Sequence, residues 1–428
     1  MSAPGFAAID FGTSNSAIAL PAGRDDVVLV ELEPGHRTMP TAVFYRSDEP
    51  GRYYGRAAIA AYVDGHDGRL MRSMKSVLGS ALIEQSTDVG GGQAVKFTDV
   101  IAGYLAHLKR MAEAAAGAPL SRVVLGRPVH FVDDDPARDA RAQAALEAAA
   151  RAVGFRELLF EYEPIAAALD HERQATREHR VLVADIGGGT SDFSLVRVGP
   201  ERRLKTDRRD DILASHGVHV AGTDFDRHVE LAAILPLLGY RSLRPARPGE
   251  PAREVPSGLY FDLATWHLIN TVYTPARVAE VKAMQRWYAD PAHHQRLCRV
   301  LQRRLGHGLA AASEQAKIEV AADGRADIDL HEVEANLCAT LDEATAAAAI
   351  EADLQRIVDA AVETVRLAGV PPASVDALYF TGGSTGLGAL VRRIAAAFAP
   401  ADVVRGDRFA SVAHGLGVRA RRVFGAAA

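Results

Sequence analysis

Residues 7–20 read AAIDFGTSNSAIAL, and residues 181–198 read VLVADIGGGTSDFSLVRV. In each stretch an apolar run ends at an aspartate, and a glycine turn and a second strand-like run follow. The two aspartates, Asp10 and Asp185, stand 175 positions apart. A strand after the glycines excludes the P-loop and the dinucleotide fingerprint, because both need a helix at that point. The pattern instead predicts two β-hairpins whose turns offer backbone N–H groups and hydroxyls to a polyphosphate from opposite sides. An acid beside each turn would repel phosphate unless a divalent cation lay between them, so the sequence implies Mg²⁺.

The bulk composition is that of a soluble globular protein with two or three domains: 428 residues, 48% hydrophobic and 24% charged. The net charge of −5 gives no support for a nucleic acid or an anionic membrane as a partner. The two cysteines, Cys298 and Cys338, exclude a disulfide framework. No signal peptide and no apolar run of about 18 residues is visible. We therefore expect a cytoplasmic protein.

The remaining pattern alternates strands and helices in both halves of the chain. We predict helices over 99–115, 136–153 and 346–368, buried strands over 123–125 and 377–380, and a polar crossover between lobes over 171–180. Strand, hairpin, strand and then helix, occurring twice, argues for an α/β fold of two related lobes. A ligand is expected in the cleft between such lobes.

Five ordered motifs carry a resemblance to a known family. The two turns, EPIAAA at 163–168, HVAGTDFD at 219–226 and GGST at 382–385 resemble the ATPase domain of the 70-kDa heat-shock chaperone (DnaK) family. The resemblance covers nearly the whole chain. It implies the actin-like ATPase fold, with two related lobes, each a mixed sheet flanked by helices, and the nucleotide in the cleft between them. The boundaries that it implies are lobe I over 1–174, lobe II over 175–403, and a C-terminal helix over 404–428 that returns to lobe I.

The resemblance assigns phosphate and metal roles to both turns. The implied phosphate-binding residues are Gly12, Thr13, Ser14 and Asn15 in the first turn and Gly187, Gly188, Gly189 and Thr190 in the second. Three consecutive glycines let the backbone approach an anion without Cβ clashes. Asp10, Asp185 and Asp192 would hold Mg²⁺, mostly through water, and orient the attacking water. The competing interpretation of each turn taken alone is an ordinary structural hairpin.

Two further charged residues match catalytic positions of the family. Lys75 lies in a segment similar to the one that bears the family's catalytic lysine, where a cation would stabilise charge on the transferred phosphoryl group. Its alternative is a solvated helix face shared with Arg72. Glu163, before Pro164, resembles the acid of the crossing helix and could orient metal-bound water. Its alternative is a plain first-turn acid of a helix.

The nucleoside is expected to contact the second lobe. Gly222 and Thr223 match a turn that closes over the phosphates, and Asp224 would cap the helix that follows. Glu314 and Lys317 match residues that bind the ribose and adenine edge, or alternatively form a surface i,i+3 ion pair. The residues expected around adenosine are Gly382, Gly383, Ser384, Gly386 and Ile318.

Three departures from the family matter. Ile318 and Gly386 stand where the chaperones usually place arginines beside adenine, so cation–π stacking on the base is lost and we expect weaker selectivity for adenine over guanine. Residues 235–305 form an insertion with two tryptophans, Trp266 and Trp287, which suggests either a partner surface or extra helical packing. The sequence stops at Ala428, shortly after the closing helix, so we expect a truncated, YegD-type branch of the family that lacks the peptide-binding domain.

The leading hypothesis is a Mg²⁺-dependent ATPase that hydrolyses ATP slowly, since no arginine finger is evident, and works as a conformational switch of chaperone type. ATP or ADP and Mg²⁺ are the expected cofactors, with K⁺ as a further candidate. An unknown protein partner, bound through residues 235–305, would read the switch. The alternatives are a non-hydrolysing, nucleotide-gated binding module, a small-molecule kinase of the same fold and a filament-forming actin relative.

Overall fold

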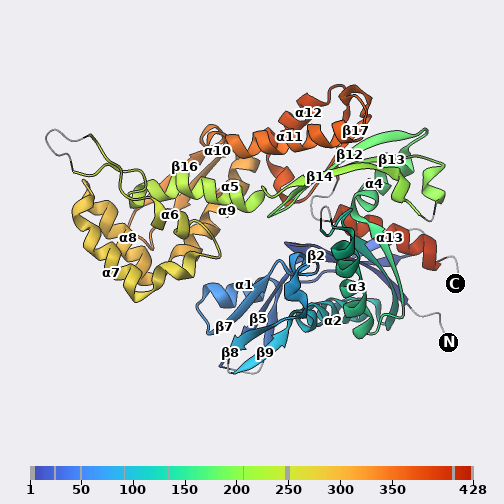
Figure 1. The fold of residues 1–428 in the computed structure, drawn as a ribbon, viewed down its shortest axis with the longest axis horizontal. Coiled ribbons are helices and arrows are strands. Elements are labelled where there is room, and N and C mark those ends of the chain that lie inside the picture. The colour runs from blue at the N-terminus through green and yellow to red at the C-terminus, as the bar shows by residue number, and fades with distance from the viewer. Residues whose placement is uncertain are drawn as a thin grey trace. The chain divides into compact units, whose positions relative to one another are not determined.

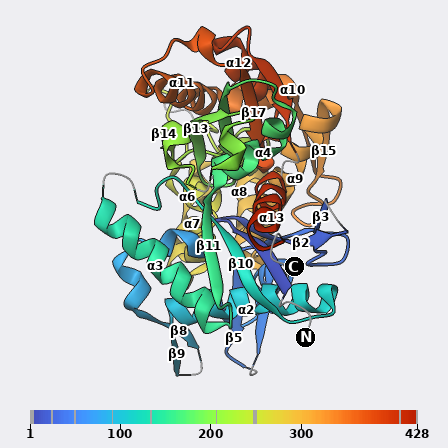
Figure 2. The same cartoon turned by 90° about the vertical axis from the view of Figure 1, so that its right-hand side faces the viewer.

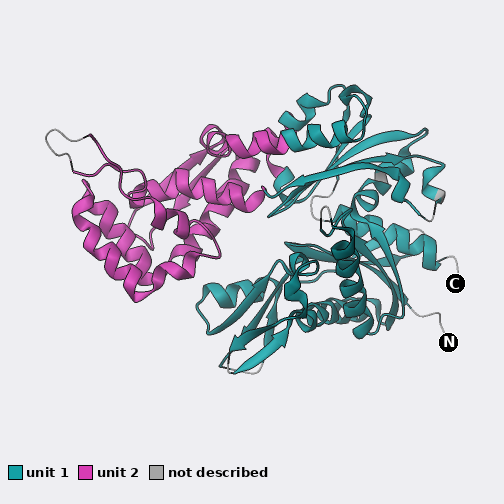
Figure 3. Ribbon diagram, viewed as in Figure 1, with its two compact units in different colours: residues 1–219, 359–385, 393–428 teal, residues 220–358, 386–392 magenta. Residues whose placement is uncertain are grey.

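The computed structural model describes residues 5–23, 26–48, 51–90, 92–132, 135–205, 207–245, 251–406 and 410–425. The chain forms two compact units (Figure 3). Unit 1 comprises residues 1–219, 359–385 and 393–428, and unit 2 comprises residues 220–358 and 386–392. The lobe boundaries predicted from the sequence divide the chain in another way, and they stay a prediction.

Unit 1 contains two large sheets of related strand order (Figure 1). The first runs β11 (Glu157–Tyr162), β10 (Leu120–Arg127), β1 (Gly5–Phe11), β2 (Asn15–Ala22) and β3 (Asp26–Leu29), with β4 (Thr38–Pro40) paired to β2. The second runs β18 (Asp402–Arg405), β17 (Ala377–Thr381), β12 (His179–Ile186), β13 (Ser191–Val198) and β14 (Ile212–Val218). In both sheets a central antiparallel hairpin has parallel strands on one side and an antiparallel strand on the other.

Alternation along the strands of the first sheet separates two buried layers. On β1, Ala7, Ile9 and Phe11 join the core around α2 (Phe97–Ala116) and α3 (Pro136–Ala152). Ala8 joins instead the core around α4 (Glu163–Gln174) and α13 (Ser411–Phe424), where strands of the second sheet also pack. Helix α13 contacts α4, β1 and β10 (Figure 2). The α4 and α13 layer therefore joins the two sheets of unit 1.

Smaller elements complete unit 1. They are a three-stranded sheet of β6 (Arg52–Tyr54), β5 (Ala42–Arg46) and β7 (Gly68–Arg72), the helix α1 (Gly55–Val63), and the hairpin of β8 (Ser86–Gly90) and β9 (Gln93–Lys96). The predicted cap of α3 is confirmed, because the Asp135 carboxylate accepts a hydrogen bond from the Arg138 backbone N–H at 2.9 Å and Pro136 opens the helix.

Unit 2 is mainly helical. Its elements are α5 (Gly222–Val229), α6 (Gly258–Leu263), α7 (Pro275–Ala283), α8 (Pro291–Arg303), α9 (Gly306–Asp323), the hairpin of β15 (Arg325–Asp329) and β16 (Cys338–Asp342), and α10 (Glu343–Ala349). Two helices, α11 (Glu351–Leu367) and α12 (Gly388–Ala397), contribute residues to both units. No helix in the described ranges has the length and apolar character needed to cross a bilayer.

Two predicted elements are wrong in extent. The crossover predicted over 171–180 is short, because α4 continues to Gln174 and β12 begins at His179. The single helix predicted over 346–368 is two helices that meet at the buried Ile350. The alanine-rich composition favours helix on both sides of that residue, so the sequence gives no signal for the break.

The predicted insertion over 235–305 packs on a core of its own. Buried residues such as Leu238, Tyr260, Leu263 and Leu297 belong to one apolar cluster of unit 2. The Tyr260 hydroxyl donates to the Leu238 carbonyl at 2.8 Å. Residues 246–250 of the insertion lie outside the described ranges. Helical packing is therefore an observed role of the insertion.

Candidate functional site

The first glycine turn links β1 to β2 and is fixed by a residue from another part of the chain. A Cβ at Gly12 would lie 2.1 Å from the Asn15 carbonyl oxygen, so this turn requires glycine. The Thr41 hydroxyl donates to the Gly12 carbonyl at 2.8 Å, and it lies 2.8 Å from the Ser16 hydroxyl. The Thr41 backbone N–H donates to the Ser14 carbonyl at 2.9 Å. Thr41 was not predicted, because a lone threonine far from the motif carries no sequence signal.

The second glycine turn links β12 to β13 and places two carboxylates side by side. Asp185 and Asp192 are opposite each other in the strand register. The Gly187 N–H closes the turn on the Thr190 carbonyl at 3.0 Å, and the Thr190 hydroxyl donates to Asp192 Oδ2 at 2.8 Å. On the neighbouring strand, a Cβ at Gly217 would lie 2.5 Å from Asp192 Oδ1. The absence of a side chain at Gly217 therefore makes room for the Asp192 carboxylate.

The GGST segment packs against this second turn, because β17 runs parallel to β12 and ends beside it. Gly382 has φ +88°, and a Cβ there would lie 2.4 Å from the Ile186 carbonyl oxygen. The Ser384 hydroxyl donates to the Gly187 carbonyl at 2.7 Å. Ser384 thus supports the turn, a role that the sequence did not predict. Its expected contact with adenosine stays a prediction.

Lys75 and Glu163 form a closely spaced ion pair, with Lys75 Nζ 2.5 Å from Glu163 Oε1. Their side chains are 10% and 13% exposed, so the pair is largely removed from solvent. Lys75 lies in the 3₁₀ helix Met74–Val77, just after Ser73 at φ +54°, and Glu163 is the first residue of α4. The solvated helix face suggested as an alternative for Lys75 is wrong, because Arg72 ends β7 and Lys75 is paired inside the unit.

The charged residues of both turns and the Lys75–Glu163 pair form one electrostatic cluster. Burial, with the carboxylates of Glu163 and Asp185, raises the pKa of Asp10 to about 8 although Lys75 opposes the shift. Burial, with Asp192 and Glu163, raises the pKa of Asp185 to about 7. Burial would lower the pKa of Lys75, but Glu163, Asp10 and Asp185 outweigh it and raise that pKa. The structure thus brings together the predicted catalytic residues of unit 1.

This cluster fits a hard divalent cation. Its donors are carboxylate oxygens and hydroxyls, the ligands that Mg²⁺ prefers. Several carboxylates share one lysine, and their mutual repulsion would be relieved by added positive charge. Among the described residues, no three His, Cys, Asp or Glu side chains are grouped to coordinate an ion directly. That a cation here binds mostly through water stays a prediction.

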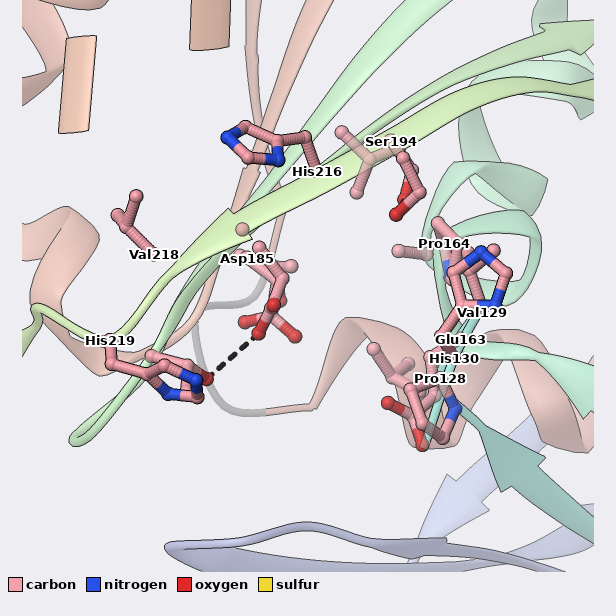
Figure 4. A pocket seen from close by; sticks show the side chains of 18 residues that line it. Pro128, Val129, His130, Glu163, Pro164, Asp185, Ser194, His216, Val218 and His219 are labelled. Atoms are coloured by element: carbon pink, nitrogen blue, oxygen red, sulfur yellow. Dashed lines mark hydrogen bonds between the residues drawn. The ribbon is translucent and has the colours of Figure 1, made fainter. Parts of the chain in front are cut away.

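A pocket with a cavity volume of about 90 Å³ lies in unit 1 beside the cluster (Figure 4). Asp185 enters it from the second sheet, and Glu163 and Pro164 enter it from α4. Strand β14 and the residue after it add His216, Val218 and His219, and His130 follows β10. His130 and His216 were missed, because single histidines in strands and loops have no distinctive spacing, and His219, which opens the HVAGTDFD motif, was given no role.

The predicted nucleoside residues of unit 2 lie around the start of α5 and one face of α9. Gly222 begins α5, so the helix starts before Asp224 and its N-cap residue is Ala221, not Asp224 as predicted. Asp224 is the third residue of the helix, and its carboxylate accepts a hydrogen bond from the Ala221 N–H at 3.1 Å. Lys317 Nζ lies 2.6 Å from Asp226 Oδ1 and donates to the Gly222 carbonyl at 3.4 Å. Lys317 therefore pairs with Asp226, and the Glu314–Lys317 surface pair suggested as an alternative is not formed.

The other residues of unit 2 that are predicted to contact the nucleotide are more exposed to solvent. Ile318 is 52% exposed, and Glu314 and Thr223 are also exposed. Gly386 ends the 3₁₀ helix Gly383–Gly386. Unit 2 contains a separate pocket that is bordered by Lys317. Its lining is mainly apolar and includes Phe225, Val320, Ala321, Ile350 and Leu387. Ile318 does not line it.

Comparison with known proteins gives a match to a family model and similarity to named proteins. Residues 6–230 match the family model described as Hsp70 protein. Over 223 residues the chain is 31% identical to a protein named chaperone protein DnaK from Mycoplasmoides gallisepticum, strain R(low / passage 15 / clone 2). That match covers 52% of this chain and 34% of the relative, so it spans about a third of the relative's length.

Proposed function

Because the chain belongs to the Hsp70 family, we propose that it binds ATP with Mg²⁺, hydrolyses it slowly and acts as a nucleotide-driven conformational switch. The fold is the actin-like ATPase fold of that family. The observation that carries the proposal is the cluster of Asp10, Glu163 and Asp185 around Lys75, between two glycine hairpins. Such a cluster suits a site that holds phosphates and a cation together.

Each group of the cluster has a role in this proposal. N–H groups and hydroxyls of the turn residues Thr13, Ser14 and Thr190 would bind phosphate oxygens. Asp10, Asp185 and Asp192 would hold Mg²⁺ through water, and bound Mg²⁺ would neutralise charge on the phosphates. Lys75 would stabilise charge that develops on the transferred phosphoryl group, while carboxylate oxygens accept hydrogen bonds from the attacking water.

The Lys75–Glu163 pair gives a reason to expect slow turnover. Lys75 Nζ already lies 2.5 Å from a carboxylate, so the lysine must share its charge between Glu163 and the phosphate. No arginine lies among the residues that line the unit 1 pocket, and an arginine finger is worth about 10³–10⁵ in rate in GTPases. Release of Lys75 from Glu163, at the start of α4, would also connect the phosphates to a helix that packs on α13.

The switch is proposed to act on a protein partner, in line with the chaperone named as a relative. Candidate contacts with that partner are the described surface residues of 235–305. The predicted base contacts Glu314, Lys317, Ile318 and Gly386 belong to unit 2, and their part in nucleotide binding stays a prediction, as does a role for K⁺.

Substitution of Lys75 and Asp185 tests the hydrolysis. Lys75→Ala and Asp185→Asn should still bind ATP in calorimetry with Mg²⁺ but hydrolyse it about 10²–10³-fold more slowly, because each removes charge stabilisation from the reacting phosphoryl group or its water. Lys109→Ala is a matched control, because Lys109 pairs with Glu113 at 2.8 Å in α2 and α2 contributes nothing to the cluster. Unchanged hydrolysis in both site variants would refute the catalytic assignment.

The unmodified protein decides between hydrolysis and its alternatives. ATP that stays intact with Mg²⁺ in a single-turnover experiment would favour the non-hydrolysing, nucleotide-gated module. Hydrolysis only in the presence of a hydroxylated small molecule would favour the kinase. Absence of any heat of ATP or ADP binding by well-folded protein would refute the nucleotide site itself.

A further inference from the structure

We propose that an arginine surface on unit 1 docks an acidic, extended peptide segment of a partner protein. This arginine surface comprises Arg203, Lys205, Arg209, Arg419 and Arg422. It combines the 3₁₀ segment that follows β13, which includes the short helices Arg202–Leu204 and Arg209–Asp211, with the last turns of α13. The proposal does not depend on nucleotide binding.

Hydrogen bonds to backbone carbonyls hold the two halves of this surface together. Arg422 donates to the Arg203 carbonyl at 3.2 Å, and Arg419 donates to the Lys205 carbonyl at 3.5 Å. Arg419 also lies 3.1 Å from a carboxylate oxygen of Glu161. The guanidinium groups of α13 are therefore anchored beside the 3₁₀ segment and do not hang free in solvent.

Two acids beneath the surface, Glu172 and Asp211, are already committed to other arginines, whereas Asp207 and Asp210 are exposed beside Arg209. Glu172 pairs with the buried Arg208 at 2.7 Å. Asp211 pairs with Arg208 at 2.5 Å and with Arg202 at 2.7 Å. These two carboxylates are 0% exposed. They are enclosed in the interior and do not provide partners at the surface itself.

Arg203 and Arg422 are left without a carboxylate among the described residues. Both are half-buried. Arg203 donates to the Pro200 carbonyl at 3.3 Å, and within the described part of the chain Arg422 donates only to the Arg203 carbonyl. A guanidinium carries five N–H donors in a planar fork that matches a carboxylate. Most donors of both arginines are thus available to an incoming acid.

The local charge is in excess around Arg422. Burial lowers the pKa of its guanidinium, and the neighbouring Arg419, Arg208 and Arg203 lower it further, although Glu172 opposes them. A carboxylate bound at Arg203 and Arg422 would compensate this excess and make charge-assisted hydrogen bonds with both groups.

The surroundings favour a peptide over a nucleic acid. The chain carries a net charge of −5, which disfavours a long polyanion, whereas a short acidic segment needs only the local arginines. Arg209 donates to the Tyr162 hydroxyl at 3.3 Å, and Tyr162 ends β11, the edge strand of the first sheet. The surface thus continues into an aromatic side chain and a strand edge, features that receive extended peptides.

Peptide binding to the full chain without nucleotide tests the proposal. The probe is a fluorescein-labelled peptide of alternating Glu and Ser, followed by anisotropy at about 0.1 M ionic strength, where exposed charges act over about 10 Å. Arg203→Gln and Arg422→Gln should each weaken binding about tenfold, because each removes a charge-assisted contact. Arg366→Gln is the control, since Arg366 is exposed in α11 and pairs with Glu363 at 2.6 Å.

Specificity controls complete the experiment. Circular dichroism verifies that the variants are folded, and a peptide of alternating Lys and Ser should not bind. Equal affinity of the unmodified protein and the Arg203→Gln/Arg422→Gln double variant would overturn the proposal. So would equal weakening by Arg366→Gln. Tighter binding of duplex DNA or of anionic vesicles than of the acidic peptide, with loss in the same variants, would also overturn it in favour of a different class of partner.

Discussion

Thr41 shows how one residue outside the motif fixes a phosphate turn. Its hydroxyl connects the Gly12 carbonyl and the Ser16 hydroxyl, and both Thr41 and Ser16 are 1% exposed. Thr41→Val keeps the volume but leaves two buried polar groups without this partner. We expect the free energy of unfolding to fall by about 1–3 kcal/mol, measured by urea denaturation.

A control variant separates this loss of stability from the effect of removing any hydroxyl group. Ser374 is half-buried, and its hydroxyl donates to the Pro371 carbonyl at 2.7 Å in a hydrogen bond at the exposed surface. Ser374→Ala should change stability by no more than about 0.5 kcal/mol. If Thr41→Val also lowers the free energy of unfolding by no more than about 0.5 kcal/mol, water replaces the Thr41 hydroxyl at the turn.

Asp10 makes stability depend on pH. Its pKa is raised from 3.8 to about 8 in the folded protein, so between these values the folded state binds more protons than the unfolded state. Stability from protonated Asp10 is complete below about pH 4 and is lost as the pH rises toward 8, by up to about 1.4 kcal/mol per pH unit. Asp10→Asn should flatten this slope in urea unfolding between pH 5 and 8, without Mg²⁺ or nucleotide.

Asp48 provides the control for this measurement. A hydrogen bond from Arg46 lowers the pKa of Asp48 to about 2, below the range of the titration. Asp48→Asn should therefore leave the slope unchanged. An equal slope in the unmodified protein and in Asp10→Asn would show that Asp10 is ionised across this range.

At the scale of the element, α4 connects the candidate site to a buried ion network. Glu163 begins the helix beside Lys75, and Glu172, near its other end, pairs with Arg208. Glu172 and Arg208 are 0% and 3% exposed. Both ends of α4 are therefore held by charge, which restricts how the helix can move when Lys75 is released.

Neutralising Glu172 should destabilise the protein strongly. Glu172→Gln leaves Arg208 with a single carboxylate partner, Asp211, inside the core. We expect the free energy of unfolding to fall by about 3 kcal/mol, because an uncompensated buried charge is costly. Glu363→Gln breaks an exposed pair with Arg366 and should cost no more than about 1 kcal/mol. Equal losses in the two variants would mean that the Glu172 pair is hydrated.

Local patterns predicted most elements because each signal lies within the element. Asp135 and Pro136 mark the start of α3, and the glycine turns mark the two central hairpins. The break at Ile350 was missed because tertiary packing, which the local pattern does not report, ends one helix and begins the next there.

For the whole molecule, the repeated order of motifs predicted two related sheets, and the strand orders around β1–β2 and β12–β13 confirm it. The residues that support the site were not predictable in this way. Thr41 acts on Gly12, and Ser384 acts on Gly187, across 29 and 197 positions. Single hydroxyls and histidines at such separations have no periodicity, so only the folded chain brings them to the site.

The hydrogen bond from Ser384 to Gly187 has a consequence for biosynthesis. A ribosome that adds about 5–20 residues per second needs about 10–40 s to pass from one partner to the other. During that interval the nascent chain carries the second turn without its final support, so any ligand that needs the finished turn arrives too late to guide the early steps of folding.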